Sequence, residues 1–327
     1  TSAAAAHWAF TQWRLRKRAK AKFSRADNML FTSEALEQAS HEAVATYHAS
    51  VVAGAQAVTA DLPAGIGSDL IAFARAGPAL GYEIDGERAE YARWNLAANG
   101  LEAEVLNRDS MSAEWTFRRA FADPGRRVGG ARTLSPADFQ PEPTGLVQRL
   151  AALDVAAIKL SPMLSDSFLR SLGGCVEFVG FGRECRKALV RFGSGGGWRA
   201  LTVEEGGPLI PEPVPPPVEH PKEVLFDVHP AAVRAGCLGT LCRRFGLSPL
   251  GDSNGYLTGG PAPHSEWLEA FAVIEGGAFS LPAIRKRLIA LGSATPVLKQ
   301  RHAGLDLDEL LKALVMRGPR CLSLAIY

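Results

Sequence analysis

The chain has 327 residues, 47% of them hydrophobic, and a formal net charge of +2 at pH 7. This length allows a large buried core and favours two domains, and the small charge excludes a polycation that coats nucleic acid without selectivity. We find no run of about 18 apolar residues and no secretory signal pattern at the start. We therefore expect a cytoplasmic protein without a membrane segment.

The cysteines and histidines give no sign of a metal site or a disulfide framework. The five cysteines are scattered, and none belongs to a Cys-x-x-Cys pair. An odd number at these spacings argues against disulfides and zinc, so we expect each cysteine to be a small buried hydrophobe. The seven histidines show no metal-ligand spacing, and we predict that no metal is bound.

Residues 1–53 predict a helical extension, because they are rich in alanine, glutamate and basic residues and contain no proline. Thr32, with Glu34 two residues later, is typical of a helix start. A basic stretch here, with Trp13 and Phe23 interleaved, either contacts phosphates or forms a solvated helix face. Its cations are Arg14, Arg16, Lys17, Arg18, Lys20, Lys22 and Arg25.

From residue 57 onward, short apolar runs alternate with helical patterns, which predicts a parallel sheet covered by helices on both faces. We expect a helix over 87–99, ended by Gly100. Residues 176–179 and 198–203 suit an antiparallel pair at a sheet edge, and 184–192 fits a helix or a strand. The main strands are expected at 57–60, 79–82, 104–106, 119–122 and 156–160. The predicted fold class is α/β, with a doubly wound Rossmann-like sheet.

A proline-rich segment marks a domain boundary, because it can continue neither a helix nor a central strand. Beyond it we expect a smaller α+β domain with strands at 224–227 and 321–326, and helices at 231–245, 282–291 and 307–316. The predicted domains are the N-terminal helical extension at 1–53, the sheet domain at 54–206, the linker at 207–221 and the α+β domain at 222–327.

The first predicted strand runs into a glycine turn, from Asp61 through Gly65 and Gly67, and a helix follows. A strand, a glycine turn and a helix N-terminus let the backbone approach a ligand closely and point free N–H groups at it. The third glycine of the dinucleotide fingerprint is absent, because Leu70 occupies its place. The turn therefore argues against a nicotinamide or flavin enzyme.

Three acids follow the next strands in order. Glu83 ends the second strand, where a carboxylate can accept hydrogen bonds from both ribose hydroxyls of a nucleoside ligand. Asp85 follows it, and Asp109 stands just past the third strand, where it can accept a bond from an adenine amino group. Each acid alone is more often a solvated loop residue, but their order at successive strand ends favours a nucleoside ligand.

These motifs together resemble a class I S-adenosylmethionine-dependent methyltransferase. Asp61, Gly65 and Gly67 match the family's methionine-binding motif. Glu83 matches its ribose acid, and Asp109 its adenine acid. The resemblance implies S-adenosylmethionine as the cofactor and methyl transfer without a metal.

The ends of the fourth and fifth strands supply the remaining candidates, because in an open parallel sheet such ends line the ligand crevice. The candidate catalytic residues are Asp123, Pro124 and Lys159. The candidate substrate-binding residues are Arg126, Arg127, Ser161 and Pro162. The arginines either hold a phosphate or pair with acids elsewhere, and Lys159 either faces the crevice or reaches outward.

The fourth strand end departs from one pattern. Methyltransferases that act on the amino groups of bases place a second proline and an aromatic residue after the acid and the first proline. This chain has Gly125 and Arg126 there, so the aromatic that would stack on a flipped base is absent. Transfer to an exocyclic amine is therefore not favoured.

The segments 36–39, 184–187, 226–236 and 256–258 resemble bacterial methyltransferase-like proteins with a C-terminal THUMP-like domain. That resemblance implies RNA as the substrate. Two alternatives stay open: an RNA-binding protein that keeps the fold without catalysis, and a methyltransferase acting on a small molecule or a protein. The cations expected to contact RNA are Arg234, Arg243, Arg244, Arg285, Lys286, Arg287, Lys299 and Arg301.

Overall fold

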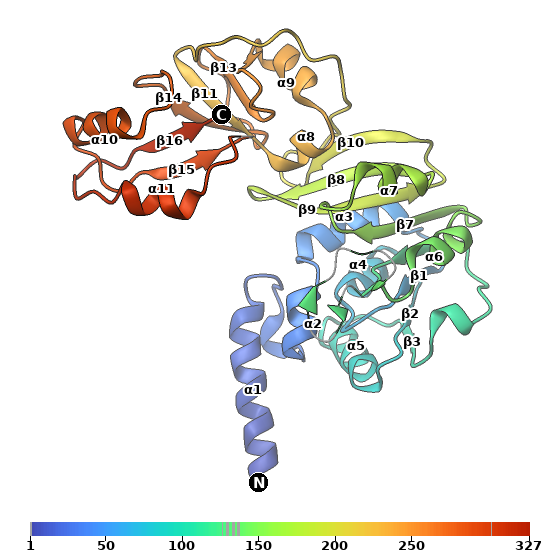
Figure 1. Ribbon diagram of the computed structural model, residues 1–327. Helices are drawn as coiled ribbons and strands as arrows, with labels where there is room; N and C mark the ends of the chain where they lie inside the picture. The colour runs from blue at the N-terminus through green and yellow to red at the C-terminus, as the bar shows by residue number, and fades with distance from the viewer. Residues whose placement is uncertain (1, 126, 129–130, 133–134, 136–137, 302) are drawn as a thin grey trace. The chain divides into compact units, whose positions relative to one another are not determined.

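The computed structural model describes residues 2–125, 127–128, 131–132, 135, 138–301 and 303–327, with only the backbone given at 127–128 and 131–132. The chain forms two compact units (Figure 1). Unit 1 comprises Thr1–Phe181 and Arg186–Trp198, and unit 2 comprises Gly182–Cys185 and Arg199–Tyr327. The domain boundaries expected from the sequence stay predictions.

An eight-stranded sheet carries the order β10-β8-β9-β7-β4-β1-β2-β3. Its strands are β1 (Thr59–Leu62), β2 (Ala79–Tyr82), β3 (Glu104–Leu106), β4 (Arg119–Ala122), β7 (Val155–Leu160), β8 (Cys175–Phe181), β9 (Glu184–Phe192) and β10 (Gly197–Thr202). The five strands from β3 to β7 in this order run parallel, and β9 is antiparallel to β7. The predicted doubly wound α/β sheet is confirmed, and the undecided segment 184–192 is a strand.

The order of the strands reverses beside β1. The chain passes from β1 to β2 and β3 on one side, and then to β4 and β7 on the other. In open α/β sheets such a switch point leaves a crevice outside the carboxyl ends of the strands, where ligands bind. A short β5–β6 pair, Arg127–Val128 with Ala131–Arg132, follows β4.

The helices of unit 1 include three that contact one another in succession, because α3 packs on α4 and α4 packs on α5. The helical elements are α1 (Ala3–Ala19), η1 (Ala26–Asn28), α2 (Ser33–Gln38), α3 (Glu42–Val52), α4 (Ser68–Ala76), α5 (Gly86–Ala98), η2 (Ser110–Ser112), α6 (Pro143–Leu150) and α7 (Asp166–Ser171). The helix start at Thr32 is confirmed, since its Oγ1 accepts the Ala35 N–H at 3.1 Å. The helix end at Gly100 is confirmed as well, because α5 stops just before this residue, whose φ is +72°.

The N-terminal helices belong to the core of unit 1. One buried cluster includes Leu15 of α1, Phe31, Ile66 in the glycine turn and Leu96 of α5. Helix α3 also contacts β4 and β7. Packing of this kind fixes the position of the glycine turn through apolar burial.

Unit 2 has a four-stranded antiparallel sheet of order β12-β13-β11-β14 and a parallel pair, β15–β16. Its elements are β11 (Val224–Val228), α8 (Pro230–Arg234), α9 (Leu238–Phe245), β12 (Ser248–Pro249), β13 (Tyr256–Gly259), β14 (Leu268–Ala272), α10 (Leu281–Ala290), β15 (Val297–Gln300), α11 (Leu307–Ala313) and β16 (Ser323–Ile326). The predicted single helix over 231–245 is wrong, because Gly236 adopts a φ of +75° and separates α8 from α9.

The turn between β8 and β9 belongs to unit 2. The Gly182 N–H donates to Glu204 Oε1 at 2.6 Å, and the Gly182 carbonyl lies 2.8 Å from His229 Nε2. Arg183 donates to the Asp227 carbonyl at 2.8 Å. Unit 2 is therefore built from two separate stretches of the chain.

Candidate active site

Asp61 lies at the switch point, near the end of β1, with its side chain almost completely buried at 1% exposure. Its Oδ2 has no hydrogen-bond partner among the described residues. Burial raises the pKa of Asp61 well above its usual range, and the carboxylates of Asp69 and Asp123 raise this pKa further. An unpaired buried acceptor costs free energy, so this atom is suited to a ligand that donates a hydrogen bond.

The glycine turn follows Asp61 and has the backbone conformation that requires glycine. Gly65 and Gly67 have φ values of +57° and +85°, and Gly67 precedes the first turn of α4. A Cβ on Gly67 would lie 3.4 Å from Ala92, whereas a Cβ on Gly65 would meet no heavy atom within 4 Å. Gly67 thus serves the packing of α5, and Gly65 borders open space that a ligand can use.

Glu83 holds the turn from the end of β2. Its buried carboxylate accepts the Gly65 N–H at 2.8 Å on Oε2 and the Asp85 N–H at 2.9 Å on Oε1. An ionised carboxylate has about four acceptor sites, so two remain for ribose hydroxyls. The structure brings Asp61, Gly65 and Glu83 together at one edge of the sheet.

Asp85 and Asp109 lie at the starts of helices. Asp85 Oδ1 accepts the Arg88 N–H at 3.0 Å at the start of α5, and Asp109 Oδ1 accepts the Met111 N–H at 2.9 Å at the start of η2. Both residues are exposed. Helix capping explains an acid at each position, and the predicted contacts with a nucleoside stay predictions.

Asp123 forms an ion pair with Lys159. Asp123 follows β4 and Lys159 belongs to β7, so the pair bridges two adjacent strand ends. The side chain of Lys159 is 10% exposed and that of Asp123 is 26% exposed. The ammonium group of Lys159 is therefore held by Asp123 and does not reach outward into solvent.

Pro124, a predicted catalytic residue, and the predicted substrate residues Ser161 and Pro162 lie close to this pair in the chain. Pro124 and Ser161 are buried, and Ser161 Oγ accepts the Met163 N–H at 3.3 Å. Pro162 is half-buried. Arg126 lies outside the described residues, and Arg127 is described only by its backbone in β5.

A buried polar cluster that the sequence did not predict adjoins Asp61. Asp69, in the first turn of α4, accepts a bond from Ser40 Oγ at 2.9 Å and lies 2.6 Å from His48 Nδ1. Burial lowers the pKa of His48 to about 4, so the neutral ring donates Nδ1–H to Asp69. Burial alone would raise the pKa of Asp69, but His48 and the nearby lysines hold it below its usual range.

Lys187 of β9 is the second buried lysine near this cluster. Burial, and next the positive charge of Lys159, lower the pKa of Lys187 to about 7. Ser40, His48, Asp69 and Lys187 are far apart in the sequence, and no motif links them. Only the fold, which places α3, α4 and β9 around the same strands, could identify them.

Asn95 ties the N-terminal extension to the glycine turn. It is fully buried, and its Oδ1 accepts the Leu30 N–H at 2.7 Å. Its Nδ2 donates to the Leu30 carbonyl at 3.0 Å and to the Ile66 carbonyl at 2.9 Å. A single α5 side chain thus satisfies three buried backbone groups, one of them inside the turn.

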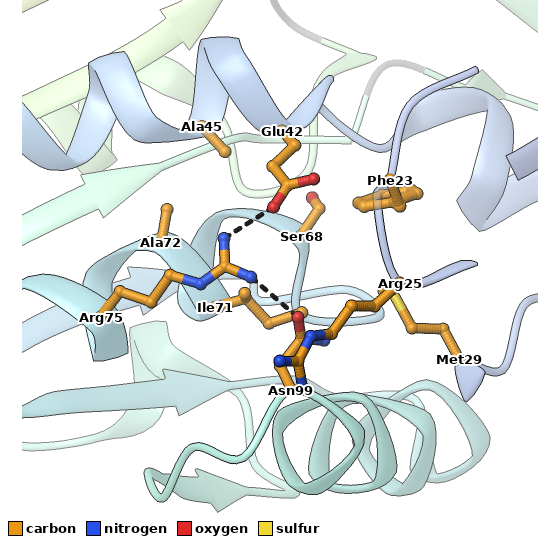
Figure 2. A pocket seen from close by; sticks show the side chains of 10 residues that line it. All are labelled: Phe23, Arg25, Met29, Glu42, Ala45, Ser68, Ile71, Ala72, Arg75 and Asn99. Atoms are coloured by element: carbon orange, nitrogen blue, oxygen red, sulfur yellow. Dashed lines mark hydrogen bonds and ion pairs between the residues drawn. The ribbon is translucent and has the colours of Figure 1, made fainter. Parts of the chain in front are cut away.

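A small pocket lies between the N-terminal segment, α3 and α4 (Figure 2). Arg75 spans it, donating to Glu42 at 2.8 Å and to Asn99 at 2.8 Å. The space inside is about 10 Å³, which is about enough for one water. The pocket is a small gap in the packing between these segments, and it is too small for a substrate.

Many of the basic side chains have partners within their own unit. Lys22 donates to three carbonyls at the end of α2, and Arg16 donates to the Met29 carbonyl at 2.9 Å. In unit 2, Lys299 and Arg301 both pair with Asp227, at 3.0 and 2.7 Å. Acid partners are also present for Arg243, Arg244 and Arg287.

Two absences concern only the part of the chain that the structure describes. Within it, no group of three or more His, Cys, Asp or Glu side chains could hold a metal ion. No helix in the same residues is long and apolar enough to cross a membrane.

The parallel sheet, its switch point and the acids at its strand ends define a Rossmann-like methyltransferase fold. No family model matches the chain. The chain is 32% identical over 335 residues to an uncharacterized S-adenosylmethionine-dependent methyltransferase of Mycobacterium tuberculosis, found in two strains, CDC 1551 and H37Rv. The match covers 98% of this chain and 92% of the relative.

One solved structure shares the fold over most of its length. A protein of Porphyromonas gingivalis W83, described as a candidate methyltransferase, has a TM-score of 0.76 at 22% identity, covering 96% of this chain and 86% of that one. With the M. tuberculosis relatives, this places the chain in the family of S-adenosylmethionine-dependent methyltransferases. It is an enzyme of that class, and S-adenosylmethionine is its cofactor.

Proposed function

We propose that this protein transfers a methyl group from S-adenosylmethionine to RNA in the cytoplasm. The observation that carries the cofactor site is the unpaired, buried Oδ2 of Asp61 beside the open space at Gly65. A carboxylate in such a place favours a cationic donor, because charged hydrogen bonds are the strong ones. The ammonium group of the cofactor's methionine part fits this requirement.

The other cofactor contacts follow the strand order. Glu83 keeps two acceptor sites for the ribose hydroxyls while it holds the Gly65 N–H. Asp85 and Asp109, exposed beyond β2 and β3, would contact the adenosine part of the cofactor. Gly67 keeps the turn close to α5, so that the Gly65 backbone can approach the ligand.

When bound, S-adenosylmethionine supplies an already activated methyl group, so the protein mainly has to align the acceptor and exclude water. Asp123 and Lys159 act as one unit at the carboxyl ends of β4 and β7, where their ion pair provides both an acceptor and a donor. Pro124 fixes the backbone beside Asp123. Ser161, Pro162, Arg126 and Arg127 complete the substrate side.

The choice of RNA rests on the resemblance of the C-terminal segments to THUMP-like domains and on the basic N-terminal stretch. Unit 2 would act as the THUMP-like, RNA-binding part. Its cations Lys299 and Arg301 are held by Asp227, so their first role is to stabilise unit 2. Cations that are not held in such ion pairs are better suited to contact phosphates. Among the described residues, Lys286 is one such cation.

Incubation of the purified protein with radiolabelled cofactor and total RNA from cells lacking the protein tests this proposal. We expect label in RNA, and a single methylated nucleoside by mass spectrometry. Asp61→Asn should lose the label, and Asp154→Asn, which changes an exposed acid paired with Arg118, should keep it. Label only in protein or in small molecules would refute RNA as the substrate.

A further inference from the structure

One face of α1 exposes aromatic and basic side chains together. The rings of Phe10 and Trp13 are stacked with centroids 5.6 Å apart, and Lys17 Nζ lies 3.8 Å from the Trp13 ring centroid. Phe10 is 56% exposed and Trp13 is 51% exposed. With Arg14, these residues occupy positions i, i+3, i+4 and i+7, so they share one side of the helix.

The other side of α1 is the one that packs into unit 1. Gln12, Leu15 and Ala19 are buried there, and Gln12 exchanges two hydrogen bonds with the backbone of Phe31 at 2.8 and 3.0 Å. Figure 1 shows α1 extending away from the rest of unit 1 toward the N-terminus. The exposed aromatic rings are therefore not needed to hold the helix in place.

The electrostatics of this face point to an anionic partner. Residues 1–26 contain no aspartate or glutamate. Nearby cations have local partners, since Lys20 pairs with Asp27 at 2.9 Å. Arg14 and Lys17 have no acidic partner among the described residues of the chain. These two charges remain available to an external ligand.

We propose that the face formed by Phe10, Trp13, Arg14 and Lys17 binds single-stranded RNA. Exposed aromatic rings stack on unpaired bases, while neighbouring cations follow the phosphate backbone. A second copy of the same face would bring like charges together, which disfavours self-association. This inference deepens the proposed function, on which it rests for RNA as the substrate, by naming where the strand is held.

Binding of a fluorescein-labelled 16-nucleotide oligouridylate, followed by anisotropy between 50 and 200 mM salt, tests the face. Phe10→Ala with Trp13→Ala should weaken binding at least tenfold, because stacking on each ring is lost. Phe279→Ala removes a 49% exposed ring in unit 2 and should leave affinity unchanged. Affinity for S-adenosylmethionine, measured by calorimetry, should be the same in all variants.

The two cations of this face are tested by the salt dependence of binding. Arg14→Ala with Lys17→Ala should reduce the slope of log K against log salt by about 1.4, since each lost phosphate contact on a single strand contributes about 0.7. Lys20→Ala is the matched control, because this cation already has an acid partner. A slope as large as that of the unchanged protein would overturn the assignment of phosphate contacts to this face.

Two further outcomes would also overturn the proposal. One is binding to phosphatidylglycerol vesicles that needs the two rings while oligouridylate binding does not. The other is a dimer, seen by sedimentation, that dissociates in the ring variant. If the protein binds oligouridylate through these rings but transfers no methyl group to RNA, the proposed function fails and this inference holds. If transfer occurs and the variants bind normally, only this inference fails.

Discussion

Asp61→Asn should change stability and cofactor binding in opposite directions. Asp61 is 1% exposed, its Oδ2 lacks a partner in the described structure, and burial with the charges of Asp69 and Asp123 raises its pKa. An acid whose pKa is raised on folding makes the folded state less stable as pH rises above the pKa of the unfolded chain. The reason is that the unfolded chain then releases a proton that the folded chain still holds. The neutral, similarly shaped asparagine avoids this loss, so the variant should be more stable than the original at pH 7, with the difference shrinking toward pH 4.

Binding should fall, because the amide lacks the charge that strengthens a bond to the cofactor's ammonium group. A hydrogen bond to a charged group is worth about 1.5–3 kcal/mol, which corresponds to a roughly 10- to 150-fold increase in Kd. Isothermal titration with S-adenosylmethionine and urea unfolding at pH 4 and pH 7 measure both effects. Asp154→Asn, at the opposite ends of the strands, is the control. An affinity within twofold of the original would refute the placement of the methionine part.

Glu83→Ala should weaken cofactor binding at least tenfold and loosen the glycine turn, because two backbone N–H groups lose their acceptor. Calorimetry measures the change in affinity, and Glu90→Ala, at an exposed position, is the control. Asn95→Ala should destabilise unit 1 by about 3–5 kcal/mol, since three buried backbone groups, including the Ile66 carbonyl, lose a partner; an unfolding midpoint in urea close to the original would contradict this. The pKa of Lys187 is lowered to about 7, so between pH 7 and pH 10 the unfolded chain holds a proton that the folded chain has released. The free energy of unfolding should therefore rise over this range, by at most about 1.4 kcal/mol per pH unit. Lys187→Met should remove this rise in urea unfolding curves at pH 6.5 and 9, and an unchanged pH dependence would show that another group titrates.

The sequence predicts the five parallel strands of the large sheet well, because they are short runs bounded by turn residues. β2, β3 and β4 begin and end at the predicted residues. In unit 2 the pattern is weaker: β14 and β15 are only partly buried, so their sequences lack a strong apolar run. There the hydrophobic period carries little information, and tertiary pairing decides the structure.

The candidate site, too, is predicted only in part by the sequence. The sequence identifies Asp61, Gly65 and Glu83 as candidates because they occupy fixed places relative to strand ends. It does not identify Asn95 or the pair of His48 and Asp69, because their partners lie at distant positions in the chain. Such contacts become visible only when helices are packed on the sheet, since an isolated buried polar residue has no sequence signature of its own.

The turn at Gly182–Cys185 affects how the protein can be divided for study. A single protease cut within the proline-rich segment separates this turn from His229 and Asp227, to which it is hydrogen-bonded. The released C-terminal fragment would lack Gly182–Cys185 and also the part of unit 2 that runs from Arg199 to the cut. Limited proteolysis should therefore yield two fragments that stay associated under native conditions, and exchange of C-terminal domains between related proteins will succeed only if the hairpin turn is transferred with them.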